Sequence, residues 1–287
     1  MKTQAEVVTQ ARTIEQIVQG QLTSDGAGVK LTRFFGHHLQ RRLDPFLMLD
    51  AFGSDDPDDY IAGFPDHPHR GFETMTYMIK GRMLHRDSQG NEGLLETGGM
   101  QWMSATRGVV HSEIPQQKEG IMQGFQLWTN LAAANKMDAP WYKDFQAQDL
   151  PRFATANGGE VIVIAGQSHG VQGAVSRPTT EPLILDIHLK QGETFTQAIG
   201  SAFTIFAQVY EGEIDVQGQP LKAQQMGIFA PATQADGVVF TAKEDSRILL
   251  VAGKPLNEPI EQYGPFVMNN KEQIYQAVND YRNGLFG

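Results

Sequence analysis

The sequence predicts a mainly β protein that consists of two tandem β-barrel domains and a short C-terminal helix. Its 30 glycines and 14 prolines make up 44 of 287 residues and are spread along the chain, which favours many short strands over a few long helices. Runs rich in β-branched and aromatic residues recur through the chain. Short blocks of the first half also recur about 130 residues later, which indicates that one β-rich unit is duplicated.

In the first half, residues 72–79 (FETMTYMI) are rich in aromatic and β-branched residues and end at a turn signal that includes Gly81. Apolar and polar residues partly alternate over residues 125–129 (FQLWT), as in a strand with one buried face. Residues 132–145, which contain Pro140, are expected to form an irregular connector. The predicted strands of this half are residues 72–79, 82–86 and 125–129.

In the second half, residues 161–165 (VIVIA) form a continuous apolar run, which is typical of a strand buried on both faces. The other predicted strands of this half are residues 183–189, 204–210, 237–241 and 248–252. Both halves are therefore expected to be built mainly from strands.

The clearest helix signal lies at the C-terminus. Asn269 is the predicted N-cap, Glu272 stands three residues later as in a capping box, and Gly284 supplies the stop. The apolar face of this helix is marked by Ile274, Val278 and Tyr281. Residues 1–21 are expected to form an N-terminal arm, whose helical content the pattern leaves open.

Charge and hydropathy exclude several classes of protein. The chain has 23 basic and 33 acidic residues, a formal net charge of -10, and no basic cluster that would bind nucleic acid directly. Its densest charge run, residues 54–59 (SDDPDD), is acidic and is expected to be a solvated loop. No apolar stretch approaches the length of a membrane span, and residues 1–20 lack a signal-peptide pattern, so a soluble cytoplasmic protein is expected.

Three pairs of blocks define the duplication. They are residues 77–81 with 208–212, residues 100–103 with 226–229, and residues 108–111 with 237–240. The blocks keep the same order at separations of 131, 126 and 129 residues. With the join placed near residues 151–170, the two domains are expected to span residues 1–150 and residues 151–287.

Four polar residues of the first copy are candidate metal ligands. Because the chain has no cysteine, a metal ion must be held by histidine and carboxylate side chains. His67 and His69 are two residues apart, as are His111 and Glu113, so each pair projects from one face of its strand. Two such pairs on neighbouring strands would bring four ligands to one point. Pro68, which lies within the first pair, suits the start of a strand or an edge strand.

The second copy lacks this set. The block offsets carry the four candidates onto Ala198, Gly200, Phe240 and Ala242. The N-terminal domain is therefore expected to bind one metal ion and the C-terminal domain none. Three imidazoles and one carboxylate suit a divalent ion of Fe, Mn, Co, Ni, Cu or Zn, and a six-coordinate ion would keep two positions open.

The remaining histidines are expected to be structural or exposed. They are His37, His38, His85, His169 and His188. His85 differs from the others because its hairpin can approach the site.

Three segments resemble the pirin family, which lies within the cupin superfamily. Residues 64–74 (FPDHPHRGFET) are similar to its first signature, and residues 101–113 (QWMSATRGVVHSE) contain its second. Residues 263–269 (YGPFVMN) resemble a segment near the family's C-terminus. The resemblance spans most of the chain and implies a bicupin with a single metal ion, usually iron, in the N-terminal barrel.

The resemblance also implies the ligand set. In pirins the ligands are the residues that match His67, His69, His111 and Glu113. The general cupin pattern instead takes its carboxylate from the first motif, here Glu73. Strand phase favours Glu113, because Glu73 follows His69 by four residues with Gly71 between them.

Two classes of function follow from the resemblance. Some pirins resemble quercetin 2,3-dioxygenases, which open a flavonol ring with O2 and release carbon monoxide; this implies a small aromatic substrate, and Glu113 as catalytic base as well as ligand. The alternative is an iron-dependent, redox-sensing regulator that binds a partner protein, for which the acidic surface would suit a basic partner. A metal-binding cupin that acts on another small phenolic compound is a third interpretation.

Overall fold

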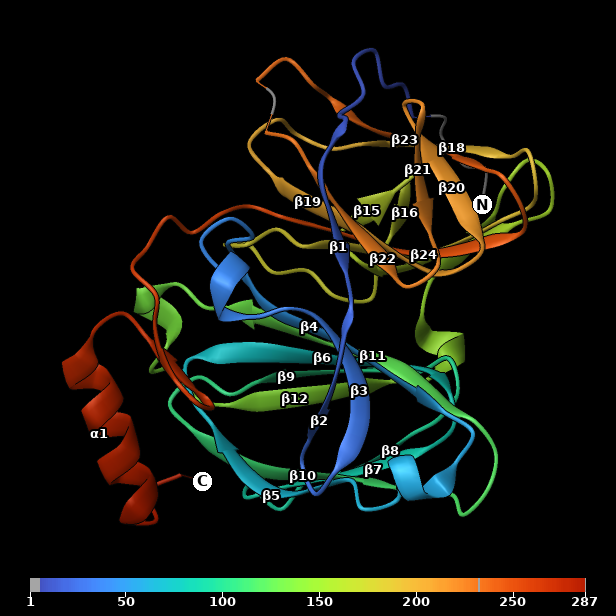
Figure 1. Ribbon diagram of the computed structural model, residues 1–287. Coiled ribbons are helices and arrows are strands. Elements are labelled where there is room, and N and C mark those ends of the chain that lie inside the picture. The colour runs from blue at the N-terminus through green and yellow to red at the C-terminus, as the bar shows by residue number, and fades with distance from the viewer. Residues whose placement is uncertain (1–5, 232, 287) are drawn as a thin grey trace. The chain divides into compact units, whose positions relative to one another are not determined.

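Figure 1 shows the computed structural model, which describes residues 6–231 and 233–286. The chain divides into two compact units. The unit that we call the first barrel contains residues 21–148 and 256–286, and the unit that we call the second barrel contains residues 6–20 and 149–255. Each end of the chain therefore belongs to the unit that is built mainly from the opposite half.

The first barrel consists of a seven-stranded and a four-stranded sheet, in both of which neighbouring strands are antiparallel. The strand orders are β12-β9-β6-β11-β4-β3-β2 and β5-β10-β7-β8. The larger sheet contains β2 (Gln21–Asp25), β3 (Val29–Phe35), β4 (Phe46–Ser54), β6 (Phe72–Lys80), β9 (Met100–Ser104), β11 (Met122–Asn130) and β12 (Trp141–Phe145). The smaller sheet contains β5 (Phe64–His69), β7 (Met83–Asp87), β8 (Glu92–Leu95) and β10 (Val109–Pro115).

Shorter elements complete the first barrel. They are the 3-10 turns η1 (His37–Leu39), η2 (Pro57–Asp59) and η3 (Ala133–Asn135), the strand pair β25 (Glu261–Tyr263) and β26 (Phe266–Met268), and the helix α1 (Lys271–Arg282). A further turn, η4 (Ala147–Asp149), connects the two units along the chain. No helix in the described ranges has both the length and the apolar composition needed to cross a membrane.

The second barrel has sheets of the same sizes, in the orders β1-β22-β19-β24-β17-β14-β13 and β18-β23-β20-β21. Its larger sheet contains β1 (Ile14–Gln19), β13 (Arg152–Ala154), β14 (Glu160–Ala165), β17 (Leu183–Leu189), β19 (Thr204–Glu211), β22 (Gln225–Phe229) and β24 (Ser246–Gly253). The smaller sheet contains β18 (Thr194–Ala198), β20 (Glu213–Val216), β21 (Gln219–Lys222) and β23 (Gly237–Ala242), and β15 (Gln167–Ser168) pairs separately with β16 (Val171–Gln172).

The two strand orders correspond position by position, which confirms two β-barrels of the same type. The strands β5-β10-β7-β8 occupy the places that β18-β23-β20-β21 occupy in the second barrel, and β6 corresponds to β19. One edge of the larger sheet is β12 in the first barrel, whereas in the second barrel β1 fills that place by pairing with β22. The two units therefore do not correspond to a simple division of the chain at residue 150. The N-terminal strand completes the second barrel, and the C-terminal segment packs on the first.

The interiors of the two barrels differ in polarity. A large cluster of buried apolar side chains, including Phe195, Val238 and Phe240, fills the second barrel. In the first barrel the apolar cluster that contains Met78 occupies only part of the interior. Two residues earlier on the same face of β6, Thr76 contacts a buried carboxylate instead. The first barrel thus keeps a polar region inside its sheets.

Two local predictions need correction. The connector over residues 132–145 contains a strand, β12, which pairs with β9. Its residues are mostly exposed or half-buried, and their sequence has too little alternation to predict a strand. The N-cap of α1 is Asn270 rather than Asn269, because the side chain of Asn270 accepts from Gln273 N at 2.9 Å. The side chain of Gln273 in turn accepts from Asn269 N at 3.0 Å, so the reciprocal capping contacts use Gln273 in place of Glu272.

The C-terminal segment is tied to the loops that flank β5 and β10. Arg70 follows β5, is 3% exposed, and donates from Nη1 to Asp280 of α1 at 2.7 Å. Its Nε donates to the carbonyl of Arg107, just before β10, at 2.6 Å. The guanidinium lies 4.5 Å from the centre of the Phe286 ring, and the backbone of Arg70 accepts from Val267 N. The last turn of the chain therefore braces both strands from outside.

Asp280→Asn is expected to lower the free energy of unfolding by about 2 kcal/mol, because the buried guanidinium of Arg70 loses a charged partner. Burial alone raises the pKa of Asp280, but hydrogen bonds from Arg70 and Gln276 and the charge of Arg70 lower it overall. Since the folded-state pKa lies below the unfolded value of about 4, this stabilisation is present above that pH and is lost as the pH falls through the folded-state pKa.

Urea unfolding of parent and variant at neutral pH and in acid measures the difference. The matched control is Asp245→Asn, whose ion pair with Lys190 is exposed and is expected to contribute much less. Equal losses in the two variants would show that the Arg70 brace has no special role.

Candidate metal centre

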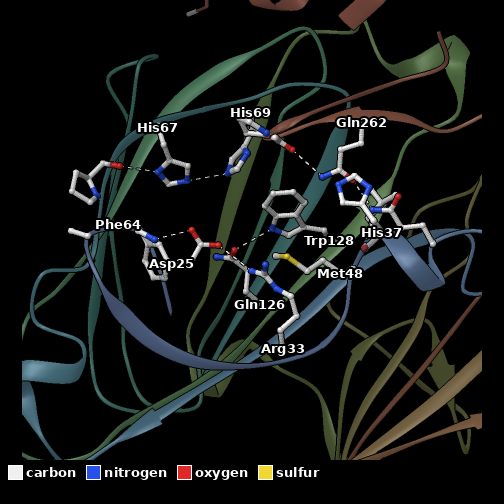
Figure 2. A pocket seen from close by; sticks show the side chains of 18 of the residues that line it. Asp25, Arg33, His37, Met48, Phe64, His67, His69, Gln126, Trp128 and Gln262 are labelled. Carbon is white, nitrogen blue, oxygen red and sulfur yellow. Dashed lines mark hydrogen bonds and ion pairs between the residues drawn. The ribbon is translucent and has the colours of Figure 1, made fainter. Parts of the chain in front are cut away.

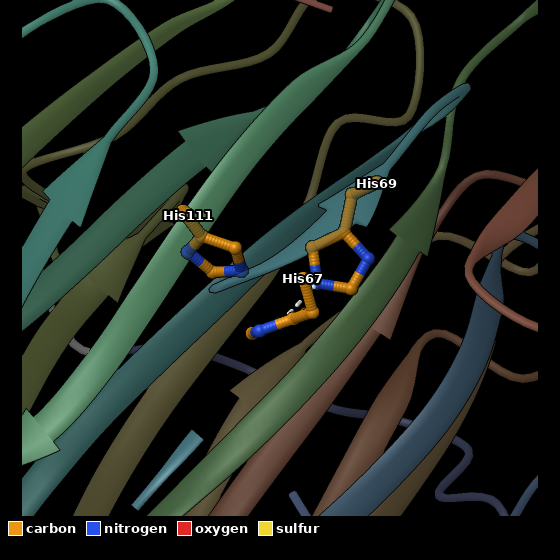
Figure 3. A group of neighbouring side chains, drawn as sticks. All are labelled: His67, His69 and His111. Atoms are coloured by element: carbon orange, nitrogen blue, oxygen red, sulfur yellow. Dashed lines mark hydrogen bonds between the residues drawn. The ribbon is translucent and has the colours of Figure 1, made fainter. Parts of the chain in front are cut away.

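Three histidines meet between the neighbouring strands β5 and β10. His67 and His69 project from the same face of β5, and His111 lies directly opposite His67 in the antiparallel register. A nitrogen atom of each ring lies within 4.8 Å of the corresponding atoms of the other two, and Nε2 of His67 is 3.0 Å from Nε2 of His69 (Figure 3). The strand phase predicted from the sequence therefore brings these three side chains together.

The local sequence explains this path. β5 is an edge strand of the smaller sheet, which is where a proline is tolerated because a backbone N–H is missing. Pro68 occupies the position between the two histidines and pairs with Val110 of β10. Of the two places that the sequence allows for Pro68, a strand start and an edge strand, the structure shows the edge strand.

The imidazoles are suited to hold a metal ion. His69 and His111 are 3% and 1% exposed. Burial, reinforced by the neighbouring imidazoles, lowers the pKa of both well below the ordinary value, and for His69 this outweighs the carbonyl of Pro265, which acts in the opposite direction. Both ring nitrogens of His111 are buried without a hydrogen-bond partner among the described residues. A metal ion would supply the missing partner, so the donor set fits one.

The two candidate carboxylates project from different places. Glu113 is 2% exposed and stands on the same face of β10 as His111. Its Oε1 accepts from Thr76 Oγ1 at 2.9 Å, and its Oε2 accepts from Gln126 Nε2 at 3.0 Å. Because alternate residues of β6 point to opposite faces, Glu73 lies on the face of β6 that Thr76 does not use.

A cavity of about 690 Å³ opens beside the histidines (Figure 2). His67 and His69 line it together with Phe64, Met48 and Trp128, which supply apolar and aromatic surface. Its polar lining includes Gln126, Arg33, Asp25 and Gln262. A cavity of this size with a few polar groups is typical of a small-molecule site.

His85 lies next to the three histidines, on the hairpin that was expected to be able to approach the site. It is 2% exposed, it lies directly opposite Glu113, and its ring centre is 4.9 Å from that of His111. The ring stacks on Tyr142 and its Nδ1 bonds to the side chain of Gln101. A fourth histidine therefore stands beside the cluster, and the pairing of β7 with β10 confirms that its hairpin approaches the site.

The other histidines do not belong to this cluster. His37 and His38 are exposed, although His37 also lines the cavity, and His169 and His188 belong to the second barrel. Two further cavity residues, Gln126 and Trp128, were not recognised as site residues. Their signal was the alternation over residues 125–129, which places both on one face of β11.

The register of the second barrel corrects the alignment of its lost ligands. Phe240 lies opposite Phe195 and Val238 lies opposite Gln197, as His111 lies opposite His67 and Val109 opposite His69. The counterparts of His67 and His69 are therefore Phe195 and Gln197 rather than Ala198 and Gly200. The block offset fails here because the loops between strands differ in length in the two copies. Two phenylalanine rings thus fill the place of two histidines.

Comparison with known proteins gives concordant matches. The family model described as Pirin matches residues 28–129, and the one described as Pirin C-terminal cupin domain matches residues 184–287. A Pseudomonas aeruginosa protein named "Putative quercetin 2,3-dioxygenase" is 48% identical, over 97% of this chain and 99% of its own. A pirin-like protein of Caulobacter vibrioides is 45% identical, over 96% of this chain and 99% of its own.

A solved structure agrees with these matches. Quercetin 2,3-dioxygenase from Acinetobacter baumannii has a TM-score of 0.89 and 34% identity, over 96% of this chain and 99% of that chain.

His69→Ala is expected to abolish stoichiometric metal binding and to leave the fold intact, because the apolar clusters of the barrels do not depend on this side chain. Elemental analysis after metal loading should give one ion per chain for the parent and none for the variant, with unchanged circular dichroism.

His188→Ala is the control, since His188 lies in the second barrel and should leave the metal content at one. Equal metal content in the His69 variant and the parent would refute the assignment. Two tightly bound ions per parent chain would refute the expectation that the second barrel binds none.

Proposed function

Because the chain belongs to the pirin family, we propose that it is a metal-dependent dioxygenase that opens the ring of quercetin or a related flavonol with O2 and releases carbon monoxide. The observation that supports this most directly is the cluster of His67, His69 and His111 at the wall of a cavity with aromatic lining. The similarity to the Acinetobacter baumannii enzyme supports the same class of reaction.

We propose Fe(II) as the ion, as the family resemblance implies, with Mn, Co, Ni, Cu and Zn as alternatives that the same donor set accepts. The three histidines would hold it, and Glu113 is the proposed fourth ligand. When bound, the ion supplies Lewis-acid and redox chemistry toward a substrate hydroxyl and O2. The residues around it bind and orient the substrate.

The cavity suits a flat aromatic molecule. Trp128 and Phe64 offer ring faces, and Met48 offers an adaptable apolar contact. Its volume of about 690 Å³ is enough for a three-ring compound together with O2.

Glu113 is the proposed base that takes the proton of the flavonol 3-hydroxyl. Its buried carboxylate already accepts two hydrogen bonds, from Thr76 and Gln126, which orient it within the barrel. A general base must reach the proton it removes, and Glu113 shares the strand face of His111. Glu73, on the other face of β6, is not proposed for this role.

The proposal is tested by loading the purified protein with Fe(II) and measuring quercetin loss together with carbon monoxide release. Release of one carbon monoxide for each quercetin consumed is expected. Absence of turnover with every divalent metal tried would contradict the enzymatic proposal and favour the alternative, a redox-sensing regulator with a partner protein. Retention of the same proteins by the Fe(II), Fe(III) and metal-free forms in a pull-down would contradict the regulator in turn.

Glu113→Gln is expected to keep an oxygen donor and to lose the proton acceptor. Activity should therefore fall much further than metal occupancy, which is expected to drop only modestly because one negative charge near the ion is removed. The informative quantity is activity per bound metal ion, from turnover and elemental analysis of one sample.

Glu73→Gln is the matched control and should change metal content little. An unchanged activity per bound ion in the Glu113 variant would show that Glu113 is not the base. If the Glu73 variant is the one that loses metal, the carboxylate ligand has been misassigned.

A further inference from the structure

A directional hydrogen-bond chain runs along the cavity wall to Glu113. Trp128 Nε1 donates to Gln126 Oε1 at 3.1 Å (Figure 2). Gln126 Nε2 in turn donates to Glu113 Oε2 at 3.0 Å. Trp128 and Gln126 are two residues apart on β11, so both project from its inward face, and both line the cavity. Hydrogen bonds thus link two residues of the cavity wall to the proposed base.

The direction of this chain is fixed by chemistry. An indole N–H can only donate, so the side-chain oxygen of Gln126 must face Trp128. The amide nitrogen of Gln126 must then face Glu113, since the two ends of a primary amide lie in one plane. A glutamine without such a neighbour could turn its amide by half a rotation. The ionised carboxylate of Glu113 can only accept and favours the same direction, so Trp128 and Glu113 together remove that freedom.

The amide nitrogen of Gln126 has one N–H group that remains available to a substrate. A primary amide has two N–H groups, and within the described part of the chain Gln126 Nε2 donates only to Glu113. Gln126 is partly buried and lines the cavity beside His67 and His69. The cavity wall therefore presents a donor, Gln126, and the acceptor Glu113 lies directly behind it, about one hydrogen-bond length from the amide nitrogen.

A substrate complementary to this pair has a hydroxyl group next to a carbonyl group. The hydroxyl donates to Glu113 and the carbonyl accepts from Gln126, and the two oxygens of a vicinal hydroxy-ketone are about 2.7 Å apart, close to the spacing of the protein pair. In a flavonol these are the 3-hydroxyl and the 4-carbonyl. A flavone lacks the first group and a flavan-3-ol lacks the second.

We infer that Gln126 is a substrate-binding residue that recognises the 4-carbonyl of a 3-hydroxy-4-keto substrate, and that Trp128 is a positioning residue that, with Glu113, holds its amide in one direction. The inference rests on the proposed flavonol reaction and specifies its substrate class. It distinguishes such substrates from simple phenols and catechols, which have no carbonyl for this donor.

The test is equilibrium binding without turnover. Fe(II)-loaded protein is titrated in the absence of O2 with quercetin, with luteolin, which lacks the 3-hydroxyl, and with catechin, which lacks the 4-carbonyl. Parent protein should prefer quercetin to both. Gln126→Met keeps the length of the side chain without its N–H groups, and it should weaken quercetin binding about 10-fold while catechin binding stays unchanged.

Trp128→Phe keeps an aromatic ring but removes the indole N–H, so it should also reduce the preference for quercetin over catechin. If Trp128 only stacks on the substrate, both ligands should weaken by the same factor. Iron content and circular dichroism are measured for each variant. The ratio of the two dissociation constants is compared at matched iron content, because quercetin and catechin present different groups to the ion.

The outcomes separate this inference from the proposed function. If the parent turns over quercetin but both variants keep its selectivity ratio, the function stands and the role of Gln126 and Trp128 is wrong. If the parent neither binds nor consumes quercetin, the proposed function fails and the inference fails with it. A Trp128→Phe variant that loses selectivity supports the inference even where Gln126→Met does not fold.

Discussion

His67 lies directly opposite His111 across the β5–β10 pair, and the rest of the site depends on this register. The side-chain period of a strand is two, so a shift of one residue would turn both β5 histidines to the other face of the sheet. The backbone ladder between two antiparallel strands therefore fixes three imidazoles at once. The Arg70 brace to Asp280 and Arg107 holds the ends of the same two strands from outside.

Placing polar groups inside a barrel requires partners for them, and the first barrel supplies these from its own strands. Glu113 accepts from Thr76 and Gln126, Gln126 accepts from Trp128, and His85 bonds to Gln101. Each bond offsets part of the desolvation of a buried polar atom. Both ring nitrogens of His111 have no such partner among the described residues, and they lie where the metal ion is expected.

The second barrel has the same topology but no histidine cluster among its described residues. Phe195 and Phe240 stand opposite each other at the positions of His67 and His111, and Ala242 follows Phe240 as Glu113 follows His111. These residues join an apolar cluster, so the interior gains hydrophobic burial where the first barrel keeps histidines and a carboxylate. The same strand arrangement therefore carries apolar packing in the second barrel and a histidine cluster in the first. The two barrels differ here at a few inward positions of paired strands.

The sequence by itself determined the β architecture and the duplication. It also determined that His67 shares a strand face with His69, and His111 with Glu113, because alternation within a strand is a local property that needs no partner. The meeting of the two pairs depends on the β5–β10 register. The sequence could not place Gln126 or Trp128 at the site, nor fix how close His85 comes to it, nor find that Phe195 and Gln197 replace His67 and His69. Those facts depend on which strand pairs with which and in what register, and loop lengths and turns set the register between segments far apart in sequence. Likewise, β1 and α1 belong to the barrels of the opposite halves because an open sheet edge and an exposed apolar surface can be covered by any segment that reaches them. Only the tertiary structure decides which segment does.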